Sequence, residues 1–529
     1  MNVGEQKETS LWVLFLGVFF ALLVLAFSYV YLVDDAYISF RYSHNLAAGE
    51  GLVFNPGEYV EGYTSLSWTL LMAIPEAFGL PTPTVSAYVG AAFALLALFE
   101  SWRTLRLLRL PAWAGATALA VLGAYPHFWM ASTMGLEGGL FAFLLALSIR
   151  LALSGKGVRA GLVGGLMFAT RPESLLLLAP FALCAFFSAD GGRLVRIFRL
   201  VIPWLGLAGT LTLWRLYYYG AWVPNTITAK SPPERDLATI LANASEGASY
   251  LSGFAWSALP LVTGAVLAVL LRPRSRASWL CLGASLAVVP VVLINGGDWM
   301  PNYRLVAVYA PVLAVSLGVA LSAFGGLVRG RALRLGLAFA LVLSTAFLPR
   351  EHWWNPKWNP KWDPTSDVEV AGAEPCLQPL SEELKPALSP SDVVSPDVLG
   401  LISYENPNVY FHDPLGLTDR RVALDGDSYY PTLGKAHFRY TYHGVRPDLI
   451  VSQFGRTPFR GEIVAVSGGT YDERYATYEL AGLTACHPKR YVVAIRREDV
   501  PRILPALAPF EPRPVEVTSA MVKKAKKRR

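Results

Sequence analysis

Two adjacent acids, Asp34 and Asp35, directly follow the first long apolar stretch of the chain. Acidic residues do little to set membrane topology, so topology does not explain the pair. A carboxylate at a membrane surface can accept a proton as a general base or coordinate a metal ion. The structural alternative is an acidic helix start that the helix dipole stabilises. The residues alone leave both interpretations open.

A helix over residues 36–48 would carry a polar stripe that continues from Asp34. That stripe holds Arg41 and Asn45, and His44 lies beside it. Arg41 and Asn45 could hold the Asp34 carboxylate in place, and Arg41 is also a candidate contact for an anionic substrate. The turn-rich segment 49–64 that follows could line a cleft above the membrane.

Further charges lie at predicted helix ends on the same side as the acidic pair: Glu137, Arg171, Glu173, Lys230, Asp298 and Arg304. Each charge alone is typical of a snorkelling or paired side chain. Together they resemble an ionic cleft for an anionic substrate, with Arg171, Lys230 and Arg304 as its cations.

Composition indicates a membrane protein. The chain has 529 residues, of which 53% are apolar and only 16% are charged, and its mean hydropathy of +0.38 exceeds that of most soluble domains. The net charge of +7 could suggest nucleic acid. However, the basic residues lie in short loops between apolar segments, where the positive-inside rule explains them. The basic residues of the tail 511–529 are typical of a solvated end or a contact with anionic lipid headgroups, so no nucleic-acid partner is expected.

Apolar runs predict about 11 transmembrane helices. The expected spans are 11–33, 84–102, 112–130, 136–153, 158–170, 173–189, 198–217, 253–271, 277–294, 305–325 and 333–348. With the N-terminus inside, every predicted cytosolic loop is basic, and residues after about 349 lie outside. Segment 65–78 is too short to span and is expected to be interfacial or re-entrant. The first run is expected to be an uncleaved signal anchor.

The part after the last span differs in composition. Four short β-rich runs, 392–394, 409–411, 449–451 and 491–495, are separated by turn residues and predict a soluble α/β domain over 366–510. The expected organisation is a transmembrane catalytic domain over 1–349 with an outer loop 34–83, a Trp/Pro-rich linker over 350–365, the α/β domain, and the tail. Cys376 and Cys486 flank the α/β domain and could form a disulfide, whereas Cys184 and Cys281 are expected to be free.

Several motifs of other functions are absent from the sequence. It has no Walker phosphate loop, no dinucleotide fingerprint and no Cys or His cluster with metal spacing. The missing phosphate loop argues against an ATP-driven pump.

A set of ordered motifs covers nearly the whole chain. It comprises Asp34-Asp35-Ala36-Tyr37-Ile38-Ser39-Phe40-Arg41-Tyr42, Gly51-Leu52-Val53-Phe54-Asn55-Pro56-Gly57-Glu58, Val60-Glu61-Gly62-Tyr63-Thr64-Ser65, Gly135-Leu136-Glu137, Thr170-Arg171-Pro172-Glu173, Pro224-Asn225-Thr226 with Ala229-Lys230, Gly296-Gly297-Asp298-Trp299-Met300-Pro301 with Arg304, Asp413-Pro414-Leu415-Gly416-Leu417-Thr418-Asp419, Gly434-Lys435-Ala436-His437 and Arg446-Pro447-Asp448. In this order the motifs resemble a bacterial GT-C glycosyltransferase family related to the actinobacterial terminal β-(1→2) arabinofuranosyltransferase of cell-wall arabinan.

The resemblance implies a polytopic α-helical membrane protein of GT-C type with a C-terminal soluble α/β domain. It implies a polyprenyl-phosphate sugar donor, with arabinofuranose as a candidate sugar, and a glycan or glycolipid acceptor on the outer face of the plasma (inner) membrane. The catalytic acid of the family maps onto Asp34 or Asp35, and the motifs add Asn225 and His437 to the cleft candidates.

The expected chemistry is direct displacement at the anomeric carbon with an aspartate as base. No cofactor is required, because arginine or lysine can hold a departing monophosphate, although a divalent metal on the acidic pair is an alternative. Two functions of other classes compete: a transporter or flippase for lipid-linked glycans, and a non-catalytic envelope assembly protein. A transporter would usually show internal repeats and charges near the bilayer midplane, and neither is evident in the sequence.

Overall fold

The computed structural model divides the chain into two compact units, each assembled from separate stretches of sequence. It describes residues 32–188, 192–231, 237–298, 300, 302–326, 330–347, 374–430, 434–454, 458–483 and 490–515. The helical unit comprises Met1–Tyr31, Ser86–Gly209 and Ala244–Asn355, and the α/β unit comprises Leu32–Val85, Thr210–Asn243 and Pro356–Arg529.

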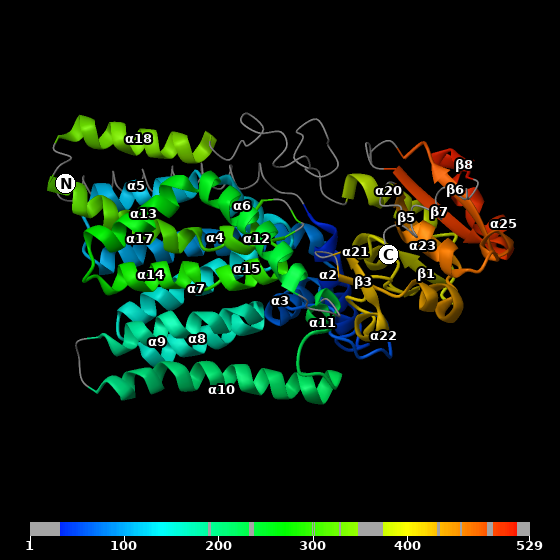
Figure 1. The fold of residues 1–529 in the computed structure, drawn as a ribbon, viewed down its shortest axis with the longest axis horizontal. Helices are drawn as coiled ribbons and strands as arrows, with labels where there is room; N and C mark the ends of the chain where they lie inside the picture. Colours follow the sequence, from blue (N-terminus) through cyan, green and yellow to red (C-terminus); the bar gives the residue numbers. More distant parts are fainter. Residues whose placement is uncertain are drawn as a thin grey trace. The chain divides into compact units, whose positions relative to one another are not determined.

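The helical unit is a bundle of apolar helices (Figure 1). Its elements are α4 (Thr82–Leu107), α5 (Ala112–Gly123), α6 (Pro126–Thr133), α7 (Gly138–Leu153), α8 (Gly157–Thr170), η1 (Pro172–Leu177), α9 (Leu178–Phe186), α10 (Arg193–Tyr219), α12 (Leu237–Ser257), α13 (Leu259–Leu271), α14 (Arg276–Leu286), α15 (Val289–Asn295), α16 (Arg304–Ala307), α17 (Ala310–Ala323), η2 (Phe324–Gly326) and α18 (Arg331–Phe347). Helices α4, α10 and α12 each begin or end in the other unit.

Helix α17 forms the centre of this bundle, because every residue from Ala310 to Leu321 is buried. It packs against α13, α5 and α14. A side chain at Gly264 of α13 would meet the backbone of Leu317, so the glycine allows the two helices to approach closely. Small residues at such contacts are typical of helix packing in membranes.

The described residues include three helices that are long and apolar enough to cross a membrane, or up to five when each bent pair counts as one span. The three are Thr82–Leu107, Arg193–Tyr219 and Arg276–Asn295, and five shorter apolar helices accompany them. The predicted short helix 65–78 is present as α3 (Leu66–Ala77). The number of about 11 crossings stays a prediction.

Several predicted spans are not single continuous helices, including 305–325, which is divided among α16, α17 and η2. The segment 112–130 is divided between α5 and α6, and 253–271 is divided between α12 and α13. A proline stands in the first turn of each second helix, Pro126 in α6 and Pro260 in α13. Proline lacks the N–H that would continue the preceding helix, so each one begins a new helix. The axes of α12 and α13 differ by 92°, and those of α6 and α7 by 115°.

The α/β unit joins three stretches of sequence. Its elements are α2 (Asp34–Ala47), α3, α11 (Asn225–Lys230), α20 (Glu374–Leu384), β1 (Val393–Pro396), α21 (Gly400–Glu405), β2 (Tyr410–Phe411), α22 (Arg420–Asp425), β3 (Asp427–Tyr430), β4 (Gly434–Ala436), the π-helix η4 (Tyr440–Val445), β5 (Leu449–Phe454), α23 (Pro458–Val466), α24 (Tyr471–Arg474), β6 (Tyr475–Leu480), β7 (Arg490–Arg496), η6 (Arg497–Asp499), α25 (Val500–Ile503), η7 (Leu504–Phe510) and β8 (Pro512–Pro514).

A mixed sheet of six strands, in the order β2-β1-β5-β7-β6-β8, forms the framework of this unit. Strand β1 pairs in parallel with β2 and β5, and the remaining pairs are antiparallel. The four strands that β-branched and aromatic runs predicted are present as β1, β2, β5 and β7. Chain segments that follow β1 and β2 therefore emerge at one edge of the sheet, where polar side chains of α/β proteins commonly meet.

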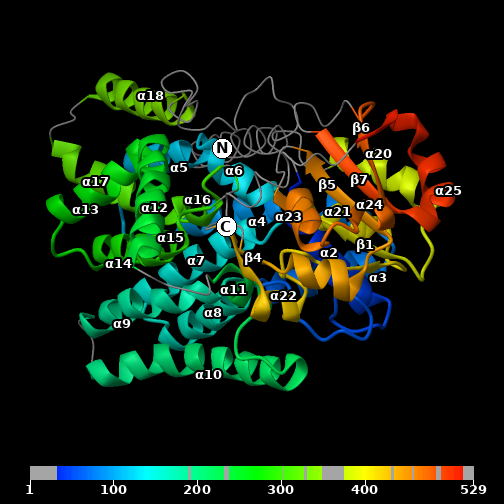
Figure 2. The same ribbon diagram turned by 45° about the vertical axis from the view of Figure 1, so that its right-hand side comes forward.

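Helix α2 packs within the α/β unit, against α3 and α21 (Figure 2). The ring of Tyr404 in α21 lies 5.7 Å from that of Tyr37 and 6.0 Å from that of Phe40. The outer loop 34–83 thus shares a core with residues that follow it by more than 300 positions.

Some predictions fall on residues outside the described part of the chain. These are most of the first span 11–33, the linker 350–365, most of the tail 511–529, and the side chains of the proposed Cys376–Cys486 pair. Cys184 and Cys281 are free and buried, as predicted.

Membrane topology can be tested with reporter fusions. Fusions after Arg109 and after Arg276 should report a cytosolic position, because the predicted cytosolic loops are all basic. A fusion after Asp363 should report a periplasmic or extracellular position. A cytosolic signal after Asp363 would contradict the predicted orientation of the α/β unit.

Candidate active site

Helix α2 begins with the acidic pair, Asp34 and Asp35, in its first turn. The helix predicted over 36–48 is therefore present, with its start two residues earlier. Acids in a first turn interact favourably with the helix dipole. The pair follows the extended residue Val33, so it stands at the point where the chain leaves the first apolar segment and enters the α/β unit.

The Asp34 carboxylate accepts two backbone hydrogen bonds from α21. The Gly400 N–H donates to Oδ2 over 2.7 Å, and the Leu401 N–H donates to Oδ1 over 2.9 Å. Burial nevertheless raises the pKa of Asp34 to about 7, because it outweighs the two amides, and the negative charges of Asp35 and Asp397 act in the same direction as burial. A carboxyl group that titrates near neutral pH is suited to act as a general base.

Arg41 and Asn45 do not hold Asp34, so that prediction was wrong. Arg41 is fully buried, and its guanidinium donates to the carbonyls of Phe54 at 2.7 Å and Val409 at 2.9 Å and to that of Ser403. Its ring partners are Phe54 and Phe411, with centroids 4.8 and 4.9 Å from the guanidinium carbon. Backbone carbonyls occupy all three of its nitrogens, which indicates a structural role in place of the predicted phosphate contact.

The amide of Asn45 serves the same loop. Its Nδ2 donates to the carbonyls of Val53 and Phe54, each over 2.9 Å. Together Arg41 and Asn45 fasten the turn-rich segment 49–64 to α2. The sequence correctly predicted that Arg41 and Asn45 lie on one face of α2. However, both side chains bind backbone carbonyls and not the acidic pair.

His44 takes part in a small network with Glu76 and Tyr404. Its Nδ1 lies 3.1 Å from Oε2 of Glu76, and the Tyr404 hydroxyl donates to Oε1 of the same carboxylate over 2.7 Å. Although burial opposes ionisation, the hydrogen bonds from His44 and Tyr404 lower the pKa of Glu76. The network ties α2, α3 and α21 together, and Glu76 and Tyr404 were not singled out in the sequence.

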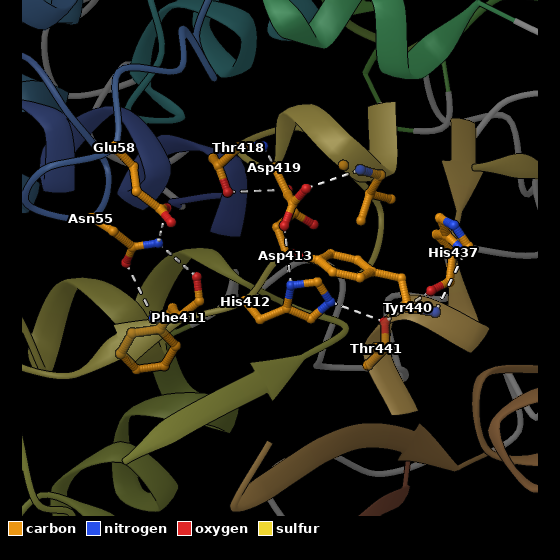
Figure 3. Close-up of polar contacts among 12 residues, drawn as sticks. Asn55, Glu58, Phe411, His412, Asp413, Thr418, Asp419, His437, Tyr440 and Thr441 are labelled. Atoms are coloured by element: carbon orange, nitrogen blue, oxygen red, sulfur yellow. Dashed lines mark hydrogen bonds and ion pairs between the residues drawn. The ribbon is translucent and has the colours of Figure 1, made fainter. Parts of the chain in front are cut away.

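A second polar cluster follows strand β2 (Figure 3). The buried His412 ring has Nε2 at 2.9 Å from the Thr441 hydroxyl and Nδ1 at 3.2 Å from Oδ2 of Asp419. Asp413 accepts the N–H groups of Leu415 and Thr418 over 2.9 and 2.7 Å. The motif Asp413-Pro-Leu-Gly-Leu-Thr-Asp419 thus forms a turn held by its two acids.

The other motif residues of the α/β unit lie around this turn. Asn225 donates through Nδ2 to the carbonyls of Gly416 at 2.8 Å and Leu417 at 3.1 Å. His437 accepts the N–H of Tyr440 through Nδ1 over 3.4 Å at the start of η4. Asn225 and His437 therefore stabilise loops, while Lys230 at the end of α11 is exposed. The sequence did not predict the ion pair between Glu61 and Arg215, both of which are buried.

The helical unit has an ionic cluster of its own. Arg171 pairs with Glu137 at 2.8 Å, and Arg304 pairs with Asp298, with Glu173 in electrostatic range of both arginines. The structure thus brings together five of the predicted charges. Nη1 of Arg171 is buried and has no hydrogen-bond partner among the described residues.

The described residues contain no group of three or more His, Cys, Asp or Glu that could hold a metal ion. The independence of metal stays a prediction.

Comparisons with known proteins agree with the motif resemblance. No family model matches the sequence. The chain is 29% identical over 273 residues to the terminal β-(1→2)-arabinofuranosyltransferase of Mycobacterium tuberculosis. The matched region covers 46% of this chain and 42% of that protein. It is 26% identical over 378 residues to the enzyme of the same name from Corynebacterium glutamicum, covering 61% of this chain and 53% of that protein. The matched part thus spans about half the length of these relatives.

The fold is similar to that of ArnT from Cupriavidus metallidurans. The crystal structure of ArnT in the apo state matches with a TM-score of 0.52 at 14% identity, covering 92% of this chain and 98% of ArnT. A structure of ArnT bound to undecaprenyl phosphate matches with a TM-score of 0.51, also at 14% identity, over 91% of this chain and 97% of that one. The resemblance to the arabinofuranosyltransferases is confirmed, and the fold is similar to that of ArnT over nearly the whole length of both proteins.

The structural role of Arg41 predicts a loss of stability. Arg41→Met should lower the free energy of unfolding by about 3 kcal/mol, because it leaves several buried carbonyls without a donor. Thermal unfolding of the purified protein without any substrate measures the change. The control is Arg513→Met, since the Arg513 side chain is 70% exposed, and its effect should stay within about 0.5 kcal/mol. Equal unfolding temperatures for both variants would refute the role.

Proposed function

We propose that this protein is a membrane glycosyltransferase that transfers a sugar from a polyprenyl-phosphate donor to a glycan or glycolipid acceptor on the outer face of the membrane. The observation that carries the proposal is the acidic pair at the start of α2, which stands in the first motif of the arabinofuranosyltransferase resemblance. ArnT, whose fold is similar, binds undecaprenyl phosphate, which supports a lipid-phosphate donor. The relatives suggest arabinofuranose as the sugar.

The reaction is a direct displacement at the anomeric carbon. The acceptor hydroxyl oxygen attacks that carbon, the bond from carbon to the phosphate oxygen breaks, and polyprenyl phosphate leaves with the bonding electrons. Asp34 accepts the proton of the hydroxyl as the new glycosidic bond forms. Its oriented carboxylate and its pKa near 7 favour Asp34 over Asp35 in this role.

The leaving phosphate requires cations. Arg171 suits this role because its Nη1 is buried without a partner among the described residues, and a phosphate oxygen would complete it. Arg304 and the exposed Lys230 are further candidates. No step of this scheme needs a metal ion, since guanidinium groups neutralise a monophosphate.

The catalytic base can be tested by single substitutions. Asp34→Asn should reduce turnover by roughly 10²–10⁴-fold with unchanged donor affinity, because asparagine cannot accept the proton. The assay measures sugar transfer from a defined polyprenyl-phosphate arabinofuranose by purified protein in nanodiscs. Asp425→Asn is the control, since the Asp425 side chain is 62% exposed, and it should keep wild-type turnover.

Full turnover in both Asp34→Asn and Asp35→Asn would show that the base lies elsewhere. A wild-type protein without any transfer, tested with several sugars on the same lipid phosphate, would refute the enzyme and favour a transporter or an assembly protein.

The phosphate contact has a test that preserves charge. Arg171→Lys keeps a cation beside Glu137 but removes the second arm of the guanidinium fork, so donor affinity should fall roughly tenfold. Arg150→Lys is a matched control, because Arg150 is also largely buried and pairs with Glu100. Binding of undecaprenyl phosphate, measured by native mass spectrometry or calorimetry, should be unchanged in this control. Equal affinities in the two variants would exclude Arg171 as the contact.

A further inference from the structure

The hydrogen-bond donors to the Asp34 carboxylate come from the C-terminal domain. The two N–H groups that hold the Asp34 carboxylate belong to Gly400 and Leu401, which follow Asp34 by 366 and 367 residues. We propose that Gly400 and Leu401 are positioning residues of the transfer reaction, whose peptide N–H groups orient the carboxylate that accepts the proton. The inference rests on the proposed function and assigns a role in the reaction to the C-terminal domain.

The close approach at Gly400 requires a residue without a side chain. A methyl group built on Gly400 would overlap the carbonyl oxygen of Asp34 and come within 2.9 Å of its Oδ2. The backbone of α21 therefore lies directly against the first residue of α2. Any larger residue at position 400 would push the two backbones apart and lengthen both hydrogen bonds.

Other contacts hold α21 in this position. The carbonyls of Ser403 and Asn406 accept hydrogen bonds from Arg41, one turn or more along α2. Tyr404 packs against Tyr37 and Phe40 and donates to Glu76. Because these contacts hold both ends of α21 within one unit, the Gly400 and Leu401 amides form a rigid support for Asp34.

Two peptide donors on one carboxylate have a chemical consequence. Each oxygen of Asp34 accepts one N–H, so the plane of the carboxylate is defined while further lone pairs stay available for a hydroxyl proton. Hydrogen bonds to the ionised form favour it and so oppose the effect of burial. Without these hydrogen bonds the pKa of Asp34 would be higher, so the carboxyl group would stay protonated up to a higher pH.

The charged groups that face Asp34 raise its pKa, in opposition to the two peptide N–H groups. Asp35 is its neighbour on α2, and Asp397 lies in the segment between β1 and α21. Ser452 at β5 donates to Oδ2 of Asp397 over 3.2 Å. The C-terminal domain therefore acts on the Asp34 carboxylate in two opposite ways. The two amides stabilise its ionised form, and the negative charge of Asp397 destabilises it.

The pH dependence of kcat/KM separates these influences. A base must be ionised to act, so wild-type activity should fall as the pH drops below about 7. Gly400→Ala weakens the amide bonds and should move this acidic limb to higher pH by roughly one unit. Asp397→Asn removes a like charge and should move the limb to lower pH. Opposite shifts from two substitutions in one domain are not expected from a general loss of stability.

Gly426→Ala is a matched control for the glycine. A methyl group at Gly426 would also overlap a backbone oxygen, that of Val422, but this glycine follows α22 and belongs to neither α2 nor α21. Its acidic limb should stay at the wild-type pH even if its unfolding temperature falls.

The outcomes distinguish this inference from the proposed function. An active wild-type enzyme whose acidic limb stays in place in both Gly400→Ala and Asp397→Asn would overturn the positioning role while the glycosyltransferase stands. If Gly400→Ala does not fold, the test rests on Asp397→Asn. An unchanged acidic limb in that variant would still overturn the positioning role, and the predicted shift to lower pH would support it. A wild-type protein without transfer activity would remove the function itself.

Discussion

The buried guanidinium of Arg41 is the interaction on which the α/β unit depends. A buried charge is costly unless it is surrounded by acceptors, and Arg41 meets this requirement with carbonyls from two distant segments, around Phe54 and from Ser403 to Val409. Its presence forces the outer loop and the C-terminal domain into one core. The orientation of α2, and with it the placement of the acidic pair, follows from that constraint.

The charged residues fall into two groups with different chemistry. In the α/β unit the carboxylate of Asp34 is held by neutral peptide donors, which leave its basicity close to what proton transfer needs. In the helical unit the arginines are held by carboxylates, which preserve their positive charge and define their direction. In the sequence, most of these residues look like ordinary paired charges.

Local patterns were sufficient to predict local structure, and distant partners were not predictable. The helix α2 and the strands β1, β2, β5 and β7 follow from periodicity and β-branched runs. The partners of Asp34 and Arg41 are peptide groups, which every residue has and which leave no signature in the sequence. The breaks before α6 and α13 did have a signal, since Pro126 and Pro260 stand there, but mean hydropathy over a window does not register a single proline.

The separation of 366 residues between Asp34 and Gly400 has a consequence for biosynthesis. The ribosome adds about 5–20 residues each second, so the start of α2 leaves it on the order of half a minute before its partner is made. During that interval the Arg41 guanidinium lacks its acceptors around Ser403 and Val409. Helix α2 can therefore adopt its final packing only after residues 400–409 have been synthesised, so the order of translation delays the assembly of the site.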